Sequence, residues 1–306
     1  AGLRYRVLEK GALVDAIYRY PTYMTFFTTS ERLEIGGHPL VTATDKPTRK
    51  EALDYYRKVA HAEALEVRPY TEVTALRRDA EGFEVSTVRR GGERRTLRSR
   101  FVALATGYFD HPNRLGVPGE DLAHVSHYYD EAHPYYGQEV VIVGAGSSAA
   151  DAALDLHRAG ARVTMVHRGD AFRHSLKYWI RPNLENRVKE GSIVAHFRTR
   201  IEAITDDAVM ATRDDRRVTI PADRVFLLTG YHASRELLDQ AGAVTDGETL
   251  AAELDERFQT SVPGLYCIGS AGFGRRTSDV FIENGLAHAE VAIADVARRV
   301  ATPTDA

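Results

Sequence analysis

Cysteine, tryptophan and long apolar runs are scarce in this chain of 306 residues. Its one cysteine, Cys267, excludes an internal disulfide framework and an internal Cys-x-x-Cys redox pair. No apolar run approaches the length of a membrane span and no signal peptide is recognisable, so we predict a cytoplasmic protein. The net charge of -3 gives no general attraction to nucleic acid or to an anionic membrane, and we expect neither as a partner.

The composition that remains is that of a globular protein. Hydrophobic residues make up 43% of the chain and charged residues 27%, which is ordinary for a folded domain. The length suffices for about two domains, each with its own core.

The most informative segment is residues 139–154, where an apolar stretch runs into a glycine turn and then into a helix. The pattern is G-x-G-x-x-A at Gly144, Gly146 and Ala149, and a second apolar strand follows at residues 162–166. Gly144 permits the tight turn, and Gly146 lets a pyrophosphate approach the backbone at the helix N-terminus. The whole βαβ context predicts a dinucleotide site and disfavours the alternative, a plain glycine turn in an α/β core.

The end of the second strand bears on the choice between NADH and NADPH. NADH sites usually have an Asp or Glu there, whereas this chain has His167 and Arg168, followed by Arg173. A guanidinium matches a 2′-phosphate, so we predict NADPH. Asp170 keeps open the alternative that these residues are only solvated charges at a strand end.

The first eleven residues predict a strand that ends in an acid, Glu9. The second strand of a dinucleotide-binding βαβ unit has this appearance, with the acid placed to accept the ribose hydroxyls. The first strand and its glycine turn would lie upstream. We infer that the chain is N-terminally truncated or represents an incomplete gene model.

One order of elements occurs twice in the sequence. A helix over residues 48–64, three antiparallel strands over 71–98 and an apolar strand at 101–105 lead to Thr106-Gly107-Tyr108. A strand at 199–204, a meander up to residue 220 and an apolar strand at 224–228 lead to Thr229-Gly230-Tyr231. The repetition predicts two related nucleotide-binding domains. Near the C-terminus, a further short strand opens into a glycine-rich loop at 269–274, before an amphipathic helix over about residues 281–299.

This arrangement resembles the thioredoxin-reductase-like pyridine nucleotide-disulfide oxidoreductases, and within them the bacillithiol-disulfide reductase subgroup. The similarity extends over essentially the entire chain. The stretches that carry the subgroup resemblance are residues 8–11, 20–28, 46–57, 177–182 and 281–285.

The resemblance implies an α/β fold with two Rossmann-like dinucleotide-binding domains, one for FAD and one for NADPH. Each domain has an antiparallel β-meander, and the second is inserted in the first. We expect residues 1–110 to form the first part of the FAD domain, without its N-terminal βα unit. Residues 111–231 would form the NAD(P)H domain, and residues 232–306 the second part of the FAD domain.

The resemblance also implies which residues bind the cofactors. Those expected at FAD are Glu9 and Lys10 at the adenosine, Thr106 and Gly107 near the domain crossover, Gly269 and Ser270 at the ribityl and pyrophosphate, and Glu283 and Asn284 at the flavin pyrimidine. Those expected at NADPH are Gly144, Gly146, Ser147, Ser148, His167, Arg168, Arg173 and Gly230.

Two departures from the family pattern concern the chemistry. Ser270 stands where related flavoproteins often have an Asp, so a charge is lost. The redox cysteine suspected in the subgroup lies in the N-terminal glycine turn, which this chain lacks. Cys267 lies within an apolar strand, where we expect a buried, inert thiol. No catalytic residue can therefore be named from the sequence.

Three other signals receive structural interpretations. His124, His127 and His133 have no carboxylate or cysteine at ligand spacing, so we predict no metal site. The arginine-rich stretch 89–100 is read as a solvated face of a sheet. Tyr178 and Trp179 are expected on a short helix stopped by Pro182, either packed between domains or acting as a lid over the nicotinamide.

The leading hypothesis is an FAD-dependent NADPH oxidoreductase that passes electrons to a low-molecular-weight disulfide or another small acceptor. The alternatives are a flavin-dependent monooxygenase and a non-catalytic NADP(H)-binding sensor. We expect a full-length parent protein to be yellow and this chain to hold FAD poorly or not at all. The sequence leaves the oligomeric state open, and proteins that it resembles are often homodimers or tetramers.

Overall fold

The computed structural model describes residues 2–277 and 279–301, which form two compact units. Unit 1 comprises Ala1–Tyr20, Met24–His111 and Tyr231–Ala306, and unit 2 comprises Pro21–Tyr23 and Pro112–Gly230. Unit 2 therefore interrupts unit 1 along the chain. The predicted fold class, two α/β dinucleotide-binding domains with the second inserted in the first, is confirmed.

Unit 2 is built on a five-stranded sheet in the order β10-β9-β8-β14-β7, and every neighbouring pair is parallel. Strand β8 leads through α3 to β9, and β9 leads through α4 to β10, so two consecutive βαβ connections form this half of the sheet. The bounds are β7 Val125–Ser126, β8 Glu139–Val143, β9 Arg162–Val166, β10 Val194–His196, β14 Arg224–Leu227, α3 Ser147–Arg158 and α4 Arg181–Lys189. A short 3₁₀ helix, η2, spans His133–Tyr135.

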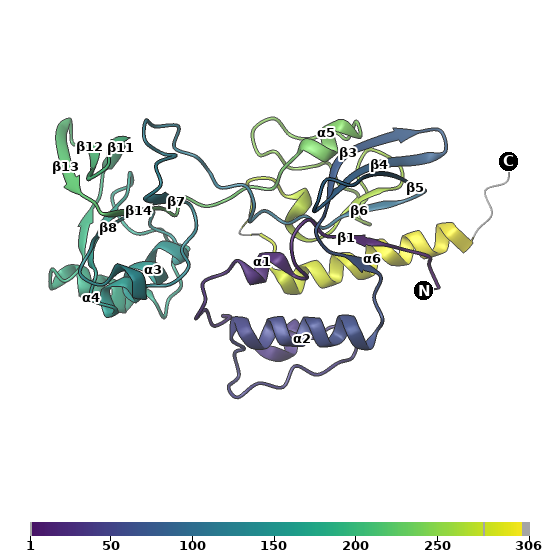
Figure 1. Cartoon of the computed structure of the whole chain (residues 1–306), viewed down its shortest axis with the longest axis horizontal. Coiled ribbons are helices and arrows are strands. Elements are labelled where there is room, and N and C mark those ends of the chain that lie inside the picture. The colour runs from purple at the N-terminus through teal and green to yellow at the C-terminus, as the bar shows by residue number, and fades with distance from the viewer. Residues whose placement is uncertain (1, 278, 302–306) are drawn as a thin grey trace. The chain divides into compact units, whose positions relative to one another are not determined.

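The two faces of this sheet are covered by different elements, as the alternating side chains of β8 show. Val140 and Ile142 belong to a core cluster with α3 and α4, the helices drawn in teal in Figure 1. Val141 and Val143 belong to a second cluster with an antiparallel meander. The strands of that meander are β11 Thr199–Ile204, β12 Ala208–Arg213 and β13 Arg216–Pro221. Both faces of β8 are buried, which explains its continuous apolar sequence.

In its described residues, unit 1 contains three small sheets. The predicted meander is antiparallel, in the order β3-β4-β5, and β6 pairs in parallel with β15. The N-terminal strand is shorter than expected, because β1 pairs with only two residues of β2. The bounds are β1 Val7–Leu8, β2 Val67–Arg68, β3 Thr71–Asp79, β4 Gly82–Arg89, β5 Arg94–Ser99, β6 Val102–Leu104 and β15 Leu265–Cys267.

Helices complete unit 1, and their ends follow local sequence signals. Helix α2 has the predicted capping box, since the Thr48 hydroxyl accepts from the Glu51 N–H while the Glu51 carboxylate accepts from the Thr48 N–H. The bounds are α1 Asp15–Tyr18, η1 Ser30–Leu33, α2 Arg49–Ala62, α5 Glu236–Gln240, η3 Gly269–Gly272 and α6 Ile282–Ala301. Among the described residues, no helix has the length and apolarity that a membrane span requires.

The main core cluster of unit 1 joins the meander to β6, β15 and α5, and Phe83 lies fully buried within it. Replacing Phe83 by alanine should lower the free energy of unfolding by about 3–5 kcal/mol, because it removes an aromatic side chain and leaves a cavity. Chemical denaturation followed by circular dichroism measures this change. The control Val41→Ala, at an exposed position, should stay within about 0.5 kcal/mol of the parent. Equal effects of the two substitutions would contradict this account of the core.

Candidate functional site

The glycine turn of unit 2 passes very close to the chain that leaves β14. A Cβ on Gly144 would lie 2.4 Å from the carbonyl oxygen of Leu228, and the backbone φ of 149° lies in a region that favours glycine. The Gly144 N–H donates to the carbonyl of Val166 at 3.0 Å. Gly144 therefore allows the chain to turn sharply at the end of β8, between the ends of β9 and β14.

Gly146 has the opposite surroundings. It is the N-cap residue of α3, and no side chain caps the helix there. A Cβ built on Gly146 would meet no heavy atom within 4 Å, so open space lies in front of the turn. The first N–H groups of a helix have no partner within the helix, and here they belong to Ser147, Ser148 and Ala149. Open space beside free N–H groups fits a pyrophosphate.

The residues predicted for the NADPH site follow neighbouring strands of the parallel sheet. Gly144 follows β8, His167 follows β9 and Gly230 follows the end of β14. Because the carboxyl ends of parallel strands lie at one edge of the sheet, the topology brings the three together. Gly230 is held there by Asn113, whose N–H donates to the Gly230 carbonyl at 2.9 Å.

The basic residues after β9 are available for an anion. The Arg173 N–H donates to the carbonyl of Ala145 at 3.3 Å, which joins this loop to the glycine turn. Arg168 and Arg173 are exposed, and neither forms an ion pair with a carboxylate in the described part of the chain. Asp170 therefore does not neutralise them. Burial lowers the pKa of His167, and the charges of Arg173 and Arg168 lower it further, so its imidazole is neutral at neutral pH.

The residues predicted for the FAD site also come together, within unit 1. Strands β6 and β15 are paired in register from Val102 opposite Leu265 to Leu104 opposite Cys267. The segments that follow them, Thr106-Gly107 and Gly269-Ser270, therefore leave the same edge. A Cβ on Gly107 would lie 4.0 Å from the Ser270 hydroxyl oxygen.

The N-terminus of α6 reaches this same edge. A Cβ on Gly285 would lie 3.5 Å from the Cα of Gly269, so the backbones of the helix and of the glycine loop nearly touch. The Asn284 side-chain oxygen accepts from the N–H of Phe281 at 3.0 Å, and Glu283 lies in the first turn of the helix. This close backbone approach fits a cofactor that lies across the ends of β6 and β15 and against the helix dipole.

Glu9 and Lys10 belong to a charge network that the sequence did not reveal. The Lys10 ammonium lies 2.8 Å from a carboxylate oxygen of Asp110, which also pairs with Arg19. Burial alone would raise the pKa of Asp110, but Lys10 and Arg19 lower it overall. The pKa of Glu9 is raised, by burial and then by the charges of Asp15 and Asp110. The sequence feature that could have identified Asp110 is the presence of an acid three residues after Gly107, beyond the end of a predicted strand.

Cys267 has the environment expected of an inert thiol. It lies on β15, fully buried in the core of unit 1, and is not in a disulfide. Burial raises the pKa of the Cys267 thiol to about 12, so the nucleophilic thiolate is scarce at neutral pH. The prediction that it is a core thiol is confirmed.

The expected short helix around Tyr178 and Trp179 is wrong. Residues 174–180 form turns, and α4 begins at Arg181 with Pro182 in its first turn. Proline is well suited to the first turn, where its missing N–H costs no hydrogen bond. Pro182 therefore starts a helix instead of ending one.

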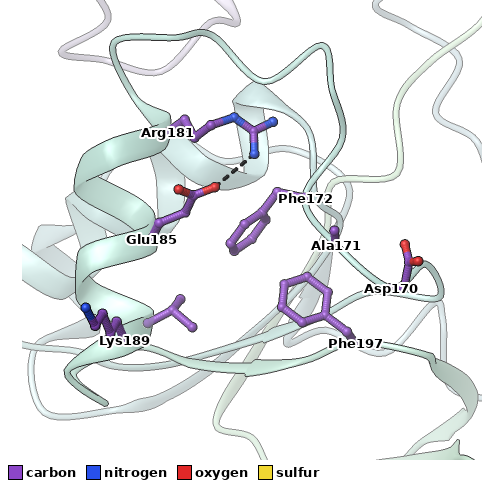
Figure 2. Close-up of a pocket in the computed structure, with 8 residues that line it drawn as sticks. Asp170, Ala171, Phe172, Arg181, Glu185, Lys189 and Phe197 are labelled. Atoms are coloured by element: carbon purple, nitrogen blue, oxygen red, sulfur yellow. Dashed lines mark hydrogen bonds and ion pairs between the residues drawn. The ribbon is translucent and has the colours of Figure 1, made fainter.

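The loop that carries these aromatic residues packs against Phe197 and helix α4. Figure 2 shows Phe172 of the loop beside Phe197, where both side chains line a pocket of about 280 Å³ together with Arg181, Glu185 and Lys189 of α4. The two rings lie 5.0 Å apart, edge to face. Arg181 pairs with Glu185 and also donates to the carbonyl of Arg173. Helix α4 therefore fixes the position of the basic loop.

Comparisons with known proteins agree with this geometry. Residues 1–269 match the pyridine nucleotide-disulphide oxidoreductase family. The chain belongs to this family. It is 38% identical over 301 residues to the bacilliredoxin reductase Bdr of Bacillus subtilis, covering 97% of this chain and 91% of the relative. The solved bacillithiol disulfide reductases Bdr of Bacillus cereus and Staphylococcus aureus align with TM-scores of 0.95 and 0.91 at 39% and 36% identity, each over 97% of this chain and 92% of the other.

Membership of the family confirms the predicted cofactors and reaction class. The protein is an FAD-dependent NADPH oxidoreductase. Relatives that align with 97% of this chain are reductases by name. The identity favours this function over the two alternatives, a flavin-dependent monooxygenase and a non-catalytic sensor.

Proposed function

We propose that the protein uses NADPH to reduce a low-molecular-weight disulfide such as bacillithiol disulfide. The observation that carries this proposal is the 38% identity to a bacilliredoxin reductase over 97% of the chain. When bound, FAD accepts a hydride from NADPH and passes two electrons to a further acceptor. Each turnover converts NADPH, a proton and a disulfide into NADP⁺ and two thiols.

In this proposal the NADPH site lies in unit 2, within residues 111–231. The open N-terminus of α3 supports it, as do the two exposed guanidiniums beside the glycine turn. The turn orients the pyrophosphate through backbone N–H groups, and Arg168 and Arg173 bind the 2′-phosphate. The full set of proposed NADPH residues is Gly144, Gly146, Ser147, Ser148, His167, Arg168, Arg173 and Gly230.

The FAD site in this proposal lies in unit 1, within residues 1–110 and 232–306. The close approach of Gly107 to Ser270, and of Gly269 to Gly285, supports it. The N-terminus of α6 would stabilise negative charge on the cofactor. The full set of proposed FAD residues is Glu9, Lys10, Thr106, Gly107, Gly269, Ser270, Glu283 and Asn284.

The proposal gives Cys267 no part in the exchange of thiols, because the side chain is buried and its thiol is protonated at neutral pH. A free thiol in a chain with one cysteine suits a reducing compartment such as the cytoplasm. A homo-oligomer remains a prediction.

Turnover with bacillithiol disulfide tests the proposal. The purified protein, supplied with FAD, should oxidise NADPH only when the disulfide is present and should release two thiols for each NADPH consumed. The Cys267→Ser variant should turn over at a rate similar to that of the parent. Oxygen uptake matched by a hydroxylated product would instead identify a monooxygenase. NADPH oxidation without formation of thiols would contradict the disulfide assignment.

A further inference from the structure

We propose that Asp110 is a positioning residue of the FAD site, where it holds the turn that carries Glu9 and Lys10 close to Gly107. This inference rests on the proposed FAD site in unit 1, and it adds a residue that the proposed set does not contain. Asp110 acts through Lys10 and does not itself contact the cofactor.

The Asp110 carboxylate binds both ends of the segment that joins β1 to α1. One of its oxygens lies 2.8 Å from the Lys10 ammonium, and the other pairs with the Arg19 guanidinium. Arg19 also donates to the carbonyl of Phe109 at 3.3 Å, and its guanidinium lies 5.3 Å from the centre of the Phe109 ring. Two cations of one segment are therefore fixed to a single carboxylate.

The turn between these two cations is itself tightly built. The Gly11 N–H donates to the Glu9 carboxylate at 2.8 Å, and the Ala12 N–H donates to the Asp15 carboxylate at 2.9 Å. A Cβ on Gly11 would lie only 2.2 Å from the carboxyl carbon of Asp15. Because Lys10 lies within this turn, a movement of Lys10 would also displace the Glu9 carboxylate.

The ion pair joins two parts of the proposed FAD site that strand pairing does not join. Strand β1 pairs with β2, whereas β6, which leads to Gly107, pairs with β15 in a different sheet. Gly107 precedes Asp110 by three residues, so their Cα atoms lie within about 11 Å of each other. The His111 N–H donates to the Tyr108 carbonyl at 3.2 Å, so the chain turns here. Asp110 therefore keeps the turn after β1 near the segment after β6.

The charges around Glu9 give this arrangement a pH dependence. Burial raises the pKa of Glu9, the Gly11 N–H lowers it, Asp15 and Asp110 raise it, and Lys10 lowers it, with a raised pKa as the result. Ribose hydroxyls donate to the ionised carboxylate. FAD affinity should therefore fall as the pH drops through this raised pKa. Removing the charge of Asp110 should lower the pKa of Glu9 and move the fall to lower pH.

Titration of the purified chain with FAD, followed by calorimetry, tests the proposal. Asp110→Asn should raise the dissociation constant for FAD about ten-fold at neutral pH, because two charge-assisted contacts are lost. Asp110→Glu should recover part of the affinity. The matched control is Asp54→Asn on α2, since Asp54 likewise pairs with a lysine and an arginine, Lys50 and Arg57. This control should leave FAD affinity unchanged. Equal effects of Asp110→Asn and Asp54→Asn would overturn the proposal.

A double-mutant cycle tests whether Asp110 acts through Lys10. Lys10→Met should itself weaken FAD binding about ten-fold, and adding Asp110→Asn should weaken it by no more than about two-fold further. Effects that multiply would mean that Asp110 acts independently of Lys10, and would overturn the assignment. Circular dichroism of each variant establishes that it is folded.

The pH profile of FAD affinity is the readout that a merely structural aspartate would not move. In Asp110→Asn the acid limb of the profile should lie at lower pH than in the parent, although affinity at neutral pH is weaker. A parallel loss of affinity at every pH would indicate a structural role only and overturn the proposal. Absence of FAD binding by the parent would instead contradict the proposed FAD site itself.

Discussion

Replacing Gly146 by valine should weaken NADPH binding about 100-fold while the protein stays folded. The backbone φ of -90° is accessible to valine, and a Cβ at this position meets no protein atom within 4 Å. The branched side chain would instead fill the space that the pyrophosphate needs. Losing about 3 kcal/mol of charge-assisted hydrogen bonds corresponds to this loss of affinity. Calorimetry with NADP⁺ measures it without the complication of turnover.

A matched control is available at Gly247, where a Cβ would likewise meet no atom within 4 Å. Gly247→Val should leave NADP⁺ affinity unchanged. The Gly146→Val variant should lose only about 1 kcal/mol of stability, because valine is a poorer N-cap residue than glycine. Unchanged NADP⁺ affinity in a folded Gly146→Val protein would show that the coenzyme does not bind at this turn.

Replacing both Arg168 and Arg173 by alanine should lower kcat/KM for NADPH about 100-fold and leave the value for NADH nearly unchanged. Both guanidiniums are exposed beside the glycine turn, and neither forms an ion pair with a carboxylate of the described chain. A 2′-phosphate would therefore gain two charge-assisted partners that carry no competing ion pair. Each such contact contributes about 1.5 kcal/mol or more. Steady-state kinetics with both coenzymes measures the change in preference.

Arg200→Ala on β11 is the control for this experiment, since it removes an exposed arginine from the meander of unit 2. It should alter neither coenzyme's kinetics. An equal loss with NADPH and NADH in the double variant would mean that the two arginines support the loop rather than recognise the 2′-phosphate.

Features set by neighbouring residues were predictable from the sequence. The capping box of Thr48 and Glu51, the glycine turn at Gly144 and the two meanders all depend on short-range spacing, and each has the predicted form. The pairing of β6 with β15 was not predicted, because it joins residues about 160 positions apart in the sequence.

Features that depend on distant partners or on an ambiguous signal were not predictable. The ion pair of Lys10 with Asp110 joins residues 100 positions apart and has no local signature, while the expected contact of Lys10 with FAD stays a prediction. Proline occurs both after the end of helices and in their first turn. Pro182 was predicted to end a helix, but it lies in the first turn of α4. The residues before Pro182 were consequently assigned to a helix, whereas residues 174–180 form turns in which Trp179 is 45% exposed.

The central claim is that one chain binds both dinucleotides and transfers electrons between them. Anaerobic addition of NADPH to the protein saturated with FAD tests it most directly, with the flavin absorbance as the readout. The account predicts that one equivalent of NADPH bleaches the bound flavin and that NADH does so far less efficiently. A flavin that stays oxidised in the presence of bound NADPH would contradict the account.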